Sequence, residues 1–270
     1  MKSPLRYPGG KSRAVKMLLQ FFPNFTEYRE PFLGGGSVYL ALKEQFPNKK
    51  YWINDLYTPL YDFWYILKYQ PKQLIGYIQS IKDNEHDGRK LFYRLKSLKT
   101  KDILENAARL FVLSRISFSG TIESGGYSEH AFYSRFTQSS IHRLSLVAPL
   151  LYHTRITNWD FEWVIKAPGK EVFLFLDPPY YSTASSKLYG KSGNLHQHFN
   201  HELLASILKN SEHKWLLTYD DCEAIRKLYS FAYIYPIELQ YGMSNRVNRK
   251  AKKGKELIIT NYPINPQKLP

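Results

Sequence analysis

Val172-Phe173-Leu174-Phe175-Leu176 runs directly into Asp177-Pro178-Pro179-Tyr180, and this stretch decides the fold of the chain. A continuous apolar run of this length, bounded by charged residues and two prolines, is typical of a strand buried on both faces of a parallel sheet. Sheets of that kind bind their ligands beyond the carboxyl ends of the strands, where Asp177 would lie. The prolines remove two N–H donors and leave carbonyl acceptors beside an acid and an aromatic ring. The stretch therefore predicts a rigid pocket that grips a planar, amine-bearing group by its edge and its face, although an ordinary strand and loop is the alternative.

The charge of the chain indicates a polyanionic partner. Its 270 residues carry a formal net charge of +15, with 43% hydrophobic and 16% aromatic residues. An excess of this size favours nucleic acid, although a merely soluble basic protein is the alternative. The single cysteine, Cys222, excludes disulfide frameworks and cysteine-based zinc sites, and no other metal site is expected because loop histidines are usually solvated. No apolar run approaches membrane-spanning length and no apolar signal segment begins the chain, so we expect a cytoplasmic protein.

The N-terminal motif Arg6-Tyr7-Pro8-Gly9-Gly10-Lys11-Ser12 combines a ring, two glycines and a lysine. The glycines permit close approach of the backbone to a ligand, and Lys11 can deliver a point charge. Ser12 is predicted to cap a helix that begins near Arg13. The spacing is not that of a Walker A loop, so binding of ATP by that route is not expected. For such a motif on its own, a glycine turn that merely precedes a helix is the commoner explanation.

The second glycine motif is Glu30-Pro31-Phe32-Leu33-Gly34-Gly35-Gly36-Ser37, which runs into a helical pattern. A glycine-rich turn between a strand and a helix lets a nucleotide-like ligand lie against the backbone. A short strand, 51–53, then ends at Asn54-Asp55. An acid at that place in a Rossmann-like unit accepts hydrogen bonds from ribose hydroxyls. With the glycine turn upstream, ribose binding is a better interpretation of Asp55 than a helix N-cap.

Residues 57–151 differ from the preceding segment in their sequence pattern, which has the periodicity of amphipathic helices and many lysines. They include a polar, glycine-rich and aromatic loop, 115–128, that is flanked by arginines. Such a loop suits contacts with base edges, an aromatic wedge and phosphate clamps, although a flexible surface connection is an equally good reading of the residues alone. The candidate nucleic-acid contacts in this region are Arg115, Phe118, Ser119, Thr121, Glu123, Tyr127 and Arg135.

The last third of the chain carries three further candidate segments. Residues 156–161 are predicted to form a strand that ends in Asp160-Phe161, a pair that can bind the amine and the face of an adenine. A helix cap and a core phenylalanine are at least as good an explanation of that pair. The loop 181–200 is too long for a simple connection and suggests a lid. A terminal hairpin then encloses a basic loop that fits either phosphate neutralisation or plain solvation, and its candidate contacts are Arg246, Arg249 and Lys250.

Together these motifs resemble the Dam-like adenine-specific DNA methyltransferases of the group with the alpha order of motifs. The likeness runs along nearly the whole chain. Residues 6–11 are similar to the family's N-terminal motif, 30–37 to its methionine-binding motif and 177–180 to its catalytic DPPY. Several motifs in register are far more specific than any one of them.

The resemblance implies a particular α/β architecture. It is a Rossmann-like, seven-stranded sheet of the S-adenosylmethionine-dependent methyltransferase type, whose antiparallel strand comes from the terminal hairpin. A catalytic domain would comprise residues 1–56 and 152–270. A mainly helical target-recognition domain, 57–151, would be inserted into it.

The resemblance also implies S-adenosylmethionine as methyl donor and N6 of an adenine in double-stranded DNA as acceptor. Asp177 and the Pro178 carbonyl would accept the two amine hydrogens, which frees the nitrogen lone pair, while Tyr180 stacks on the base. The adenine must be flipped out of the duplex, and positioning and electrostatics would supply most of the rate without a metal. The implied catalytic residues are Asp177, Pro178, Pro179 and Tyr180. The implied cofactor-binding residues are Tyr7, Gly9, Gly10, Lys11, Glu30, Pro31, Phe32, Gly34, Gly36, Ser37, Asp55, Asp160, Phe161 and Asp177.

The recognition loop departs from the family pattern. Members that read GATC tend to carry an Asn-Gly-Leu-x-Arg stretch where this chain has Ser119-Gly120-Thr121-Ile122-Glu123. An acid in place of the arginine removes a guanine contact and can accept a hydrogen bond from a cytosine amine. We therefore predict a target other than GATC.

Two other functions stay open on the sequence alone. An enzyme with a similar pocket could act on RNA or on cytosine N4. Enzymes that methylate cytosine N4, however, more often have Ser at the position of Asp177. A non-catalytic nucleic-acid-binding protein would keep the fold and the charge, but the intact 177–180 motif and Lys11 argue against it. A restriction endonuclease that cuts the same site is a partner that the class allows, and a monomer is its default state.

Overall fold

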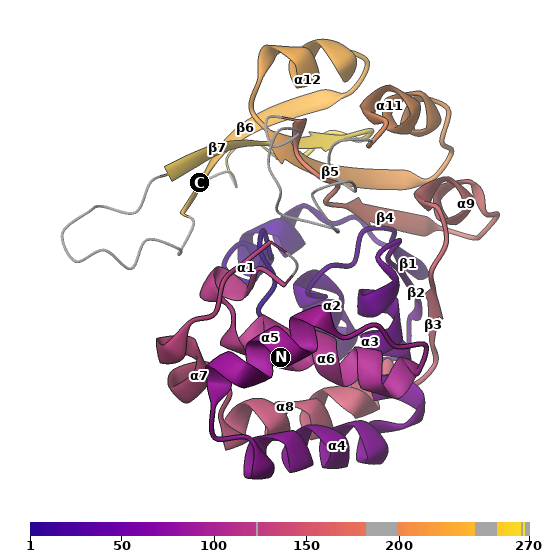
Figure 1. Ribbon diagram of the computed structural model, residues 1–270. Coiled ribbons are helices and arrows are strands. Elements are labelled where there is room, and N and C mark those ends of the chain that lie inside the picture. The colour runs from indigo at the N-terminus through magenta and orange to yellow at the C-terminus, as the bar shows by residue number, and fades with distance from the viewer. Residues whose placement is uncertain (123, 182–198, 241–252, 266, 268–270) are drawn as a thin grey trace.

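A computed structural model describes residues 1–122, 124–181, 199–240, 253–265 and 267. In this part of the chain seven strands form one sheet in the order β3-β2-β1-β4-β5-β7-β6 (Figure 1). All neighbouring strands are parallel except β7, which runs antiparallel to β5 and β6. The strands are β1 Glu27–Glu30, β2 Lys50–Asn54, β3 Thr154–Thr157, β4 Val172–Leu176, β5 Lys214–Asp220, β6 Tyr233–Gln240 and β7 Lys253–Thr260. The predicted Rossmann-like methyltransferase sheet, with its antiparallel strand from the terminal hairpin, is confirmed.

The central strand, β4, is buried along its whole length because helices cover both faces of the sheet. Phe173 and Phe175 belong to one hydrophobic cluster, whereas Val172, Leu174 and Leu176 belong to another. This alternation is the two-residue period of a strand, so a continuous apolar run supplies both cores. The prediction of a strand buried on both faces is confirmed.

The helices α3 to α8 all come from the single connection between β2 and β3 and gather on one side of the sheet (Figure 1). They share a continuous core with that face, since Phe63 and Phe111 belong to the same cluster as Phe173. The helices α9, α11 and α12 cover the opposite face. The predicted helical character of residues 57–151 is confirmed. The bounds are α1 Val15–Leu18, α2 Ser37–Gln45, α3 Thr58–Tyr69, α4 Pro71–Asn84, α5 Gly88–Ser97, α6 Ile103–Ile116, α7 Glu129–Arg135, α8 Gln138–Val147, α9 Phe161–Lys166, α11 His201–Lys209 and α12 Glu223–Leu228, with 3₁₀ helices η1 Leu19–Phe21, η2 Phe118–Gly120 and η3 Ala148–Leu151.

No helix in the described part of the chain combines the length and the hydrophobicity that a bilayer crossing requires.

Two local predictions are wrong. The first helix begins at Val15 after Ala14 and has no side-chain cap, so Ser12 does not cap it. The strand predicted to reach Asp160-Phe161 ends at Thr157. It ends there because the backbone N–H of Trp159 donates to Asn54 Oδ1 at 2.9 Å, which turns the chain out of the ladder.

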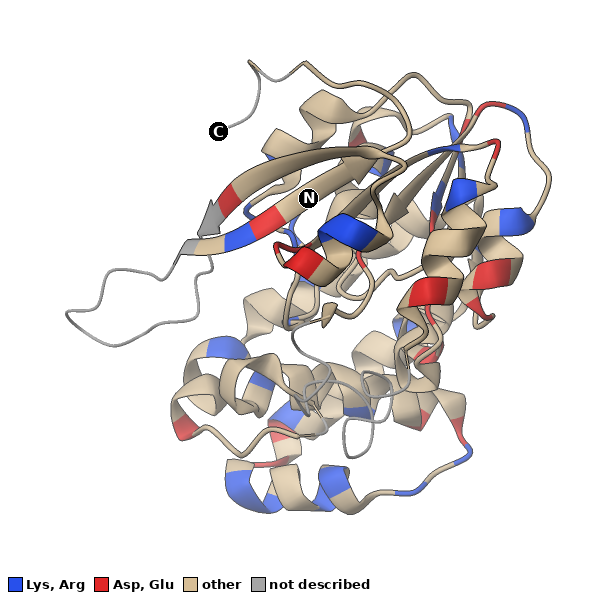
Figure 2. Cartoon of the chain, turned by 90° about the horizontal axis from the view of Figure 1, so that it is seen from above, with Lys and Arg blue, Asp and Glu red and all other residues tan. Residues whose placement is uncertain are grey.

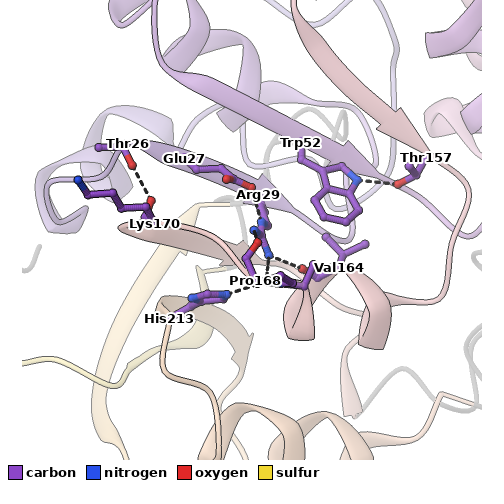
Figure 3. A network of polar contacts seen from close by, with 10 residues as sticks. Thr26, Glu27, Arg29, Trp52, Thr157, Val164, Pro168, Lys170 and His213 are labelled. Carbon is purple, nitrogen blue, oxygen red and sulfur yellow. Dashed lines mark hydrogen bonds and ion pairs between the residues drawn. The ribbon is translucent and has the colours of Figure 1, made fainter.

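A buried arginine ties the loop that leads into β4 to the neighbouring strand β1 (Figure 3). Arg29 is 1% exposed, and its Nε donates to Glu27 Oε1 at 2.6 Å. Its Nη1 donates to the carbonyls of Val164 and Ala167, at 3.0 and 2.5 Å, and its Nη2 to that of Pro168 at 2.9 Å. Because a buried charge is tolerated only when it is paired and hydrogen-bonded, this network fixes where β4 begins and therefore where Asp177 lies.

Candidate active site

The carboxyl ends of three neighbouring strands place acids at one edge of the sheet. β1 ends at Glu30, β2 ends just before Asp55, and β4 ends just before Asp177. These strands are parallel neighbours, so their carboxyl ends meet at the edge where open α/β sheets bind ligands. A cavity of about 650 Å³ opens there. Small-molecule sites typically occupy about 300–1,000 Å³, so the cavity has the size of one.

This cavity brings together every catalytic and cofactor-binding residue that the sequence predicted. The N-terminal motif, the glycine turn and the three strand ends all contribute to its wall. The predicted residues in the lining are Tyr7, Gly9, Gly10, Lys11, Glu30, Pro31, Phe32, Gly34, Gly36, Ser37, Asp55, Asp160, Phe161, Asp177, Pro178, Pro179 and Tyr180. The described members of the predicted DNA-contact set lie outside the lining.

The carboxylate of Asp177 is held from two sides. Lys11 Nζ donates to its Oδ1 at 2.7 Å and to its Oδ2 at 2.8 Å, and Thr218 Oγ1 donates to Oδ1 at 2.7 Å. The Lys11 side chain is 4% exposed and that of Asp177 is 20% exposed, so the pair is buried but the acid still reaches the cavity. Oδ1 accepts from two protein donors and Oδ2 from one. Oδ2 therefore keeps the larger capacity to accept a hydrogen bond from a ligand.

The glycine turn is shaped by Asp55 and by Tyr7. Asp55 Oδ2 accepts from the Gly34 N–H at 2.9 Å, and its Oδ1 accepts from the Tyr57 N–H at 3.0 Å. Gly34 has φ +52°, and a side chain there would meet the Tyr7 ring at 3.3 Å. The turn leads into α2, whose first residue, Ser37, follows an N-cap without a side-chain hydrogen bond. The Tyr39 N–H in the first turn of α2 donates to the Glu30 carboxyl group, which leaves the N–H groups of Ser37 and Val38 for an anionic group of a ligand.

The cavity is acidic although the chain is basic. Glu30, Asp55, Asp177, Asp220 and Glu256 all line it. Burial, with smaller contributions from the neighbouring Asp177 and Asp55, raises the pKa of Glu30 to about 8, against the lowering effect of hydrogen bonds from Tyr28 and from the Tyr39 N–H. Burial also raises the pKa of Asp55 to about 6 and that of Glu256 to about 7. So dense a set of carboxyl groups favours a cationic ligand.

An aromatic wall closes one side of the cavity. The ring centroid of Phe161 lies 5.4 Å from that of Phe32 and 5.5 Å from that of Phe199. Asp160, at the same place, caps α9 by accepting from the Glu162 N–H at 2.9 Å. Because a carboxylate has more acceptor sites than this bond uses, the cap and a contact with a ligand are compatible.

The sequence also matches a known family over most of its length. Residues 7–243 fit the model of the D12 class N6 adenine-specific DNA methyltransferases. The chain belongs to this family. It is therefore an enzyme that methylates adenine in DNA, as the resemblance of its motifs to the Dam-like methyltransferases predicted.

Relatives of this methyltransferase cover nearly all of it. Type II methyltransferase M.CviBI of Paramecium bursaria Chlorella virus NC1A is 26% identical over 272 residues, which are 97% of this chain and 100% of that protein. Type II methyltransferase M1.LlaDCHI of Lactococcus lactis subsp. cremoris is 24% identical over 286 residues, 95% of this chain and 94% of that protein. Modification methylase StsI of Streptococcus sanguinis is 27% identical over 297 residues, which are 97% of this chain but 43% of that longer protein.

The described members of the predicted DNA-contact set lie on the helical insertion, with Arg115 in α6, Arg135 in α7 and the others in the loop between these two helices. Phe118 is 69% exposed, and the loop is pinned at its base by a bridge between Ser117 and Tyr127. Ser119 has φ +56°, and the Thr121 hydroxyl donates to the Phe118 carbonyl at 2.7 Å. The loop thus presents an aromatic side chain outward from a tight turn.

The arginines of this surface differ in exposure. Arg135, at the end of α7, is exposed. Arg115, which we predicted as a phosphate clamp, is 5% exposed, and its Nη2 donates to the Pro4 carbonyl. Arg115 is therefore not an exposed side chain, because the N-terminal segment packs over it. Glu123, Arg246, Arg249 and Lys250 lie outside the described residues, as does most of the loop predicted as a lid.

Sequence reasoning missed two polar residues of the cavity region. Thr218 lies in the middle of β5 and donates to Asp177, and Glu256 lies in β7 and is 1% exposed. Glu256 lies near the Lys11 ammonium, which lowers its pKa, and near the Asp177 carboxylate, which raises it. Each is a polar residue inside an apolar strand, and that signal alone could have marked them.

Proposed function

We propose that this methyltransferase uses S-adenosylmethionine, bound in the acidic cavity, to methylate N6 of an adenine flipped out of duplex DNA. The observation that carries the proposal is that one cavity joins the glycine turn, the acids and the Asp177-Pro178-Pro179-Tyr180 motif. A cavity lined by the glycine turn alone, or by the Asp177 motif alone, would fit many small molecules. A cavity lined by both supports a methyl-donor site directly beside an amine-binding site.

The chemistry of the lining fits this methyl donor. S-adenosylmethionine carries a sulfonium and an ammonium, for which the carboxyl groups of Glu30, Asp177 and Glu256 are complementary. Its carboxylate suits the uncapped start of α2. Asp55 would accept from the ribose hydroxyls, and Asp160 and the Phe161 ring would hold the adenine. When bound, the sulfonium supplies an electrophilic methyl carbon.

The residues around Asp177 would prepare the acceptor. The N6 amine of adenine is a poor nucleophile because its lone pair is delocalised into the ring. Asp177 Oδ2 and the Pro178 carbonyl would accept its two hydrogens and draw the nitrogen toward tetrahedral geometry. Lys11 and Thr218 hold the carboxylate still, which removes reorganisation from the reaction. Burial raises the pKa of Tyr180 well above its usual value, so its phenol stays neutral and can stack on the base.

The donor can be tested by ligand-induced stabilisation. We expect S-adenosylmethionine to raise the midpoint of thermal unfolding and ATP to leave it unchanged at the same concentration, because both carry adenosine but ATP is an anion that the acids repel. A ligand at 100 times its dissociation constant stabilises by about 2.7 kcal/mol, which is readily measured. Equal stabilisation by both ligands would contradict the proposed role of the acids.

We further propose that residues 57–151 form the target-recognition domain, inserted into a catalytic domain of 1–56 and 152–270. Its loop carries Phe118 as a wedge that could fill the space of the extruded base. We also propose that the enzyme has a cognate restriction endonuclease, because its relatives include type II methyltransferases and a modification methylase. We further propose that it acts as a monomer in the cytoplasm.

The target sequence is proposed to differ from GATC because Ser119-Gly120-Thr121-Ile122-Glu123 lacks the arginine that reads a guanine. We expect plasmid DNA from a host that has no adenine methylation of its own to carry N6-methyladenine in another motif when it expresses this chain. Long-read sequencing of native plasmid measures this directly. Modification confined to GATC would contradict the proposal.

A further inference from the structure

Four arginines converge beside the recognition loop. The guanidinium of Arg115 is repelled by those of Arg6, Arg135 and Arg143, and that of Arg6 by that of Arg135. Within the described residues none of the four forms an ion pair. They come from separate parts of the chain, namely the N-terminal motif, the end of α6, the end of α7 and the middle of α8.

Two of these guanidinium groups have buried donors without an acceptor. Arg6 Nη1 and Arg115 Nε are both buried and make no hydrogen bond. Arg115 as a whole is 5% exposed, and burial together with its cationic neighbours lowers its pKa to about 9, so it stays charged at neutral pH. A buried, charged donor without a partner is costly, and four like charges add repulsion. Such an arrangement is incomplete without an anion that offers several acceptor oxygens.

A phosphate group matches this requirement. Its oxygens accept from the planar fork of a guanidinium in bidentate geometry, and arginine clusters are the usual phosphate receptors. The position also points to DNA. The backbone of Arg6 packs so closely on Gly120 of the recognition loop that a side chain at Gly120, which has φ +73°, would lie 2.5 Å from the Arg6 carbonyl. Lys and Arg are spread along the helices of the same insertion (Figure 2).

We propose that Arg6, Arg115, Arg135 and Arg143 form a binding site for one phosphate group of the DNA backbone. The site rests on the proposed function, since it names how the same enzyme holds its substrate. Arg135 is exposed and Arg6 and Arg143 are half-buried, so these three side chains can contact the phosphate, while the buried charge of Arg115 stands behind them.

The proposal is tested with Arg135→Gln and Arg143→Gln, and with Lys209→Gln as a control that removes one charge from α11 on the opposite face of the sheet. We expect each arginine variant to bind duplex DNA with a salt dependence, as the slope of log K against log salt concentration, that is smaller by about 0.9, the value for one phosphate. In phosphate-free buffer the same variants should unfold at the wild-type temperature or above it, because repulsion is relieved. Inorganic phosphate should raise the unfolding temperature of the wild type and of the control, but not of the arginine variants.

Three results would overturn the site. A lower unfolding temperature of both variants with an unchanged salt slope would make the arginines merely structural. Stabilisation by inorganic phosphate with an unchanged salt slope would assign the site to a free anion instead of DNA. A slope change in Lys209→Gln equal to that of the arginine variants would make the effect one of net charge. Methyl transfer by the wild type is assayed separately. If the wild type transfers no methyl group but the arginine variants still change the salt slope, the proposed function is contradicted and the phosphate site is supported.

Discussion

Replacing Asp177 with alanine is expected to lower the turnover number by about 1,000-fold, the usual cost of removing a preorganised group at the reacting atom. In the proposed mechanism the variant would leave the N6 amine with one acceptor, the Pro178 carbonyl. It also leaves the buried Lys11 ammonium without the carboxylate that it contacts at 2.7 and 2.8 Å. Single-turnover transfer of a labelled methyl group to duplex DNA measures the effect on the chemical step.

Two further variants separate chemistry from folding in this test. Asp177→Asn keeps the shape of the side chain but places an amide donor against Lys11, so it should be nearly as inactive as Asp177→Ala. Asp221→Ala makes the same truncation just after β5, at an acid that pairs with Arg226 and lies outside the cavity lining. It should retain activity within about threefold, since exposed ion pairs contribute about 0–1 kcal/mol. Activity of Asp177→Ala above a tenth of the wild-type value would contradict the assignment.

Glu30→Gln is expected to stabilise the protein without ligand at alkaline pH. The pKa of Glu30 is raised from 4.5 to about 8 by burial and by the nearby carboxylates of Asp177 and Asp55. The native state therefore holds the proton more tightly than the unfolded chain, and Glu30 lowers stability progressively as pH rises from about 4.5 to about 8. Each pKa unit corresponds to about 1.4 kcal/mol, so the gain from the neutral glutamine should reach the order of 4 kcal/mol above pH 8.

Urea denaturation between pH 5 and pH 9 measures this gain. The free energies of unfolding of the wild type and of Glu30→Gln should agree near pH 5 and separate as pH rises. Glu162→Gln is the matched control, because Glu162 pairs with Lys166 on the surface of α9 and its loss should change stability by less than about 1 kcal/mol. Parallel pH curves for wild type and Glu30→Gln would contradict the argument. If the curves separate as expected, the buried Glu30 carboxylate destabilises the enzyme without ligand. A cationic methyl donor bound beside Glu30 would offset that cost.

The elements that carry the site could be read from the sequence because their signals are local. Three strand ends are each marked by residues adjacent in the chain. The signals are the apolar run before Asp177, the glycine turn before α2 and the acid after β2. Parallel topology then brings such ends together at one edge. This is why the predicted catalytic and cofactor-binding residues line one cavity.

Contacts between distant residues could not be read in the same way. The bond between Lys11 and Asp177 spans 166 positions, and the bond between Thr218 and Asp177 spans 41. Nothing local marks Arg115 as buried, because the Pro4 segment that covers it lies 111 positions away in the sequence. The strand before Asp160 was predicted too long for a related reason. Its end is set by the Asn54 side chain of a different strand, which accepts from the Trp159 N–H.

The central claim is that this cavity transfers a methyl group from a sulfonium to N6 of adenine in duplex DNA. Its most direct test is incubation of the protein with unmethylated duplex DNA and S-adenosylmethionine that carries a trideuterated methyl group, followed by mass spectrometry of the nucleosides. The account predicts trideuterated N6-methyldeoxyadenosine with the wild type and almost none with Asp177→Ala. Label on cytosine N4, or equal labelling by the two proteins, would contradict it.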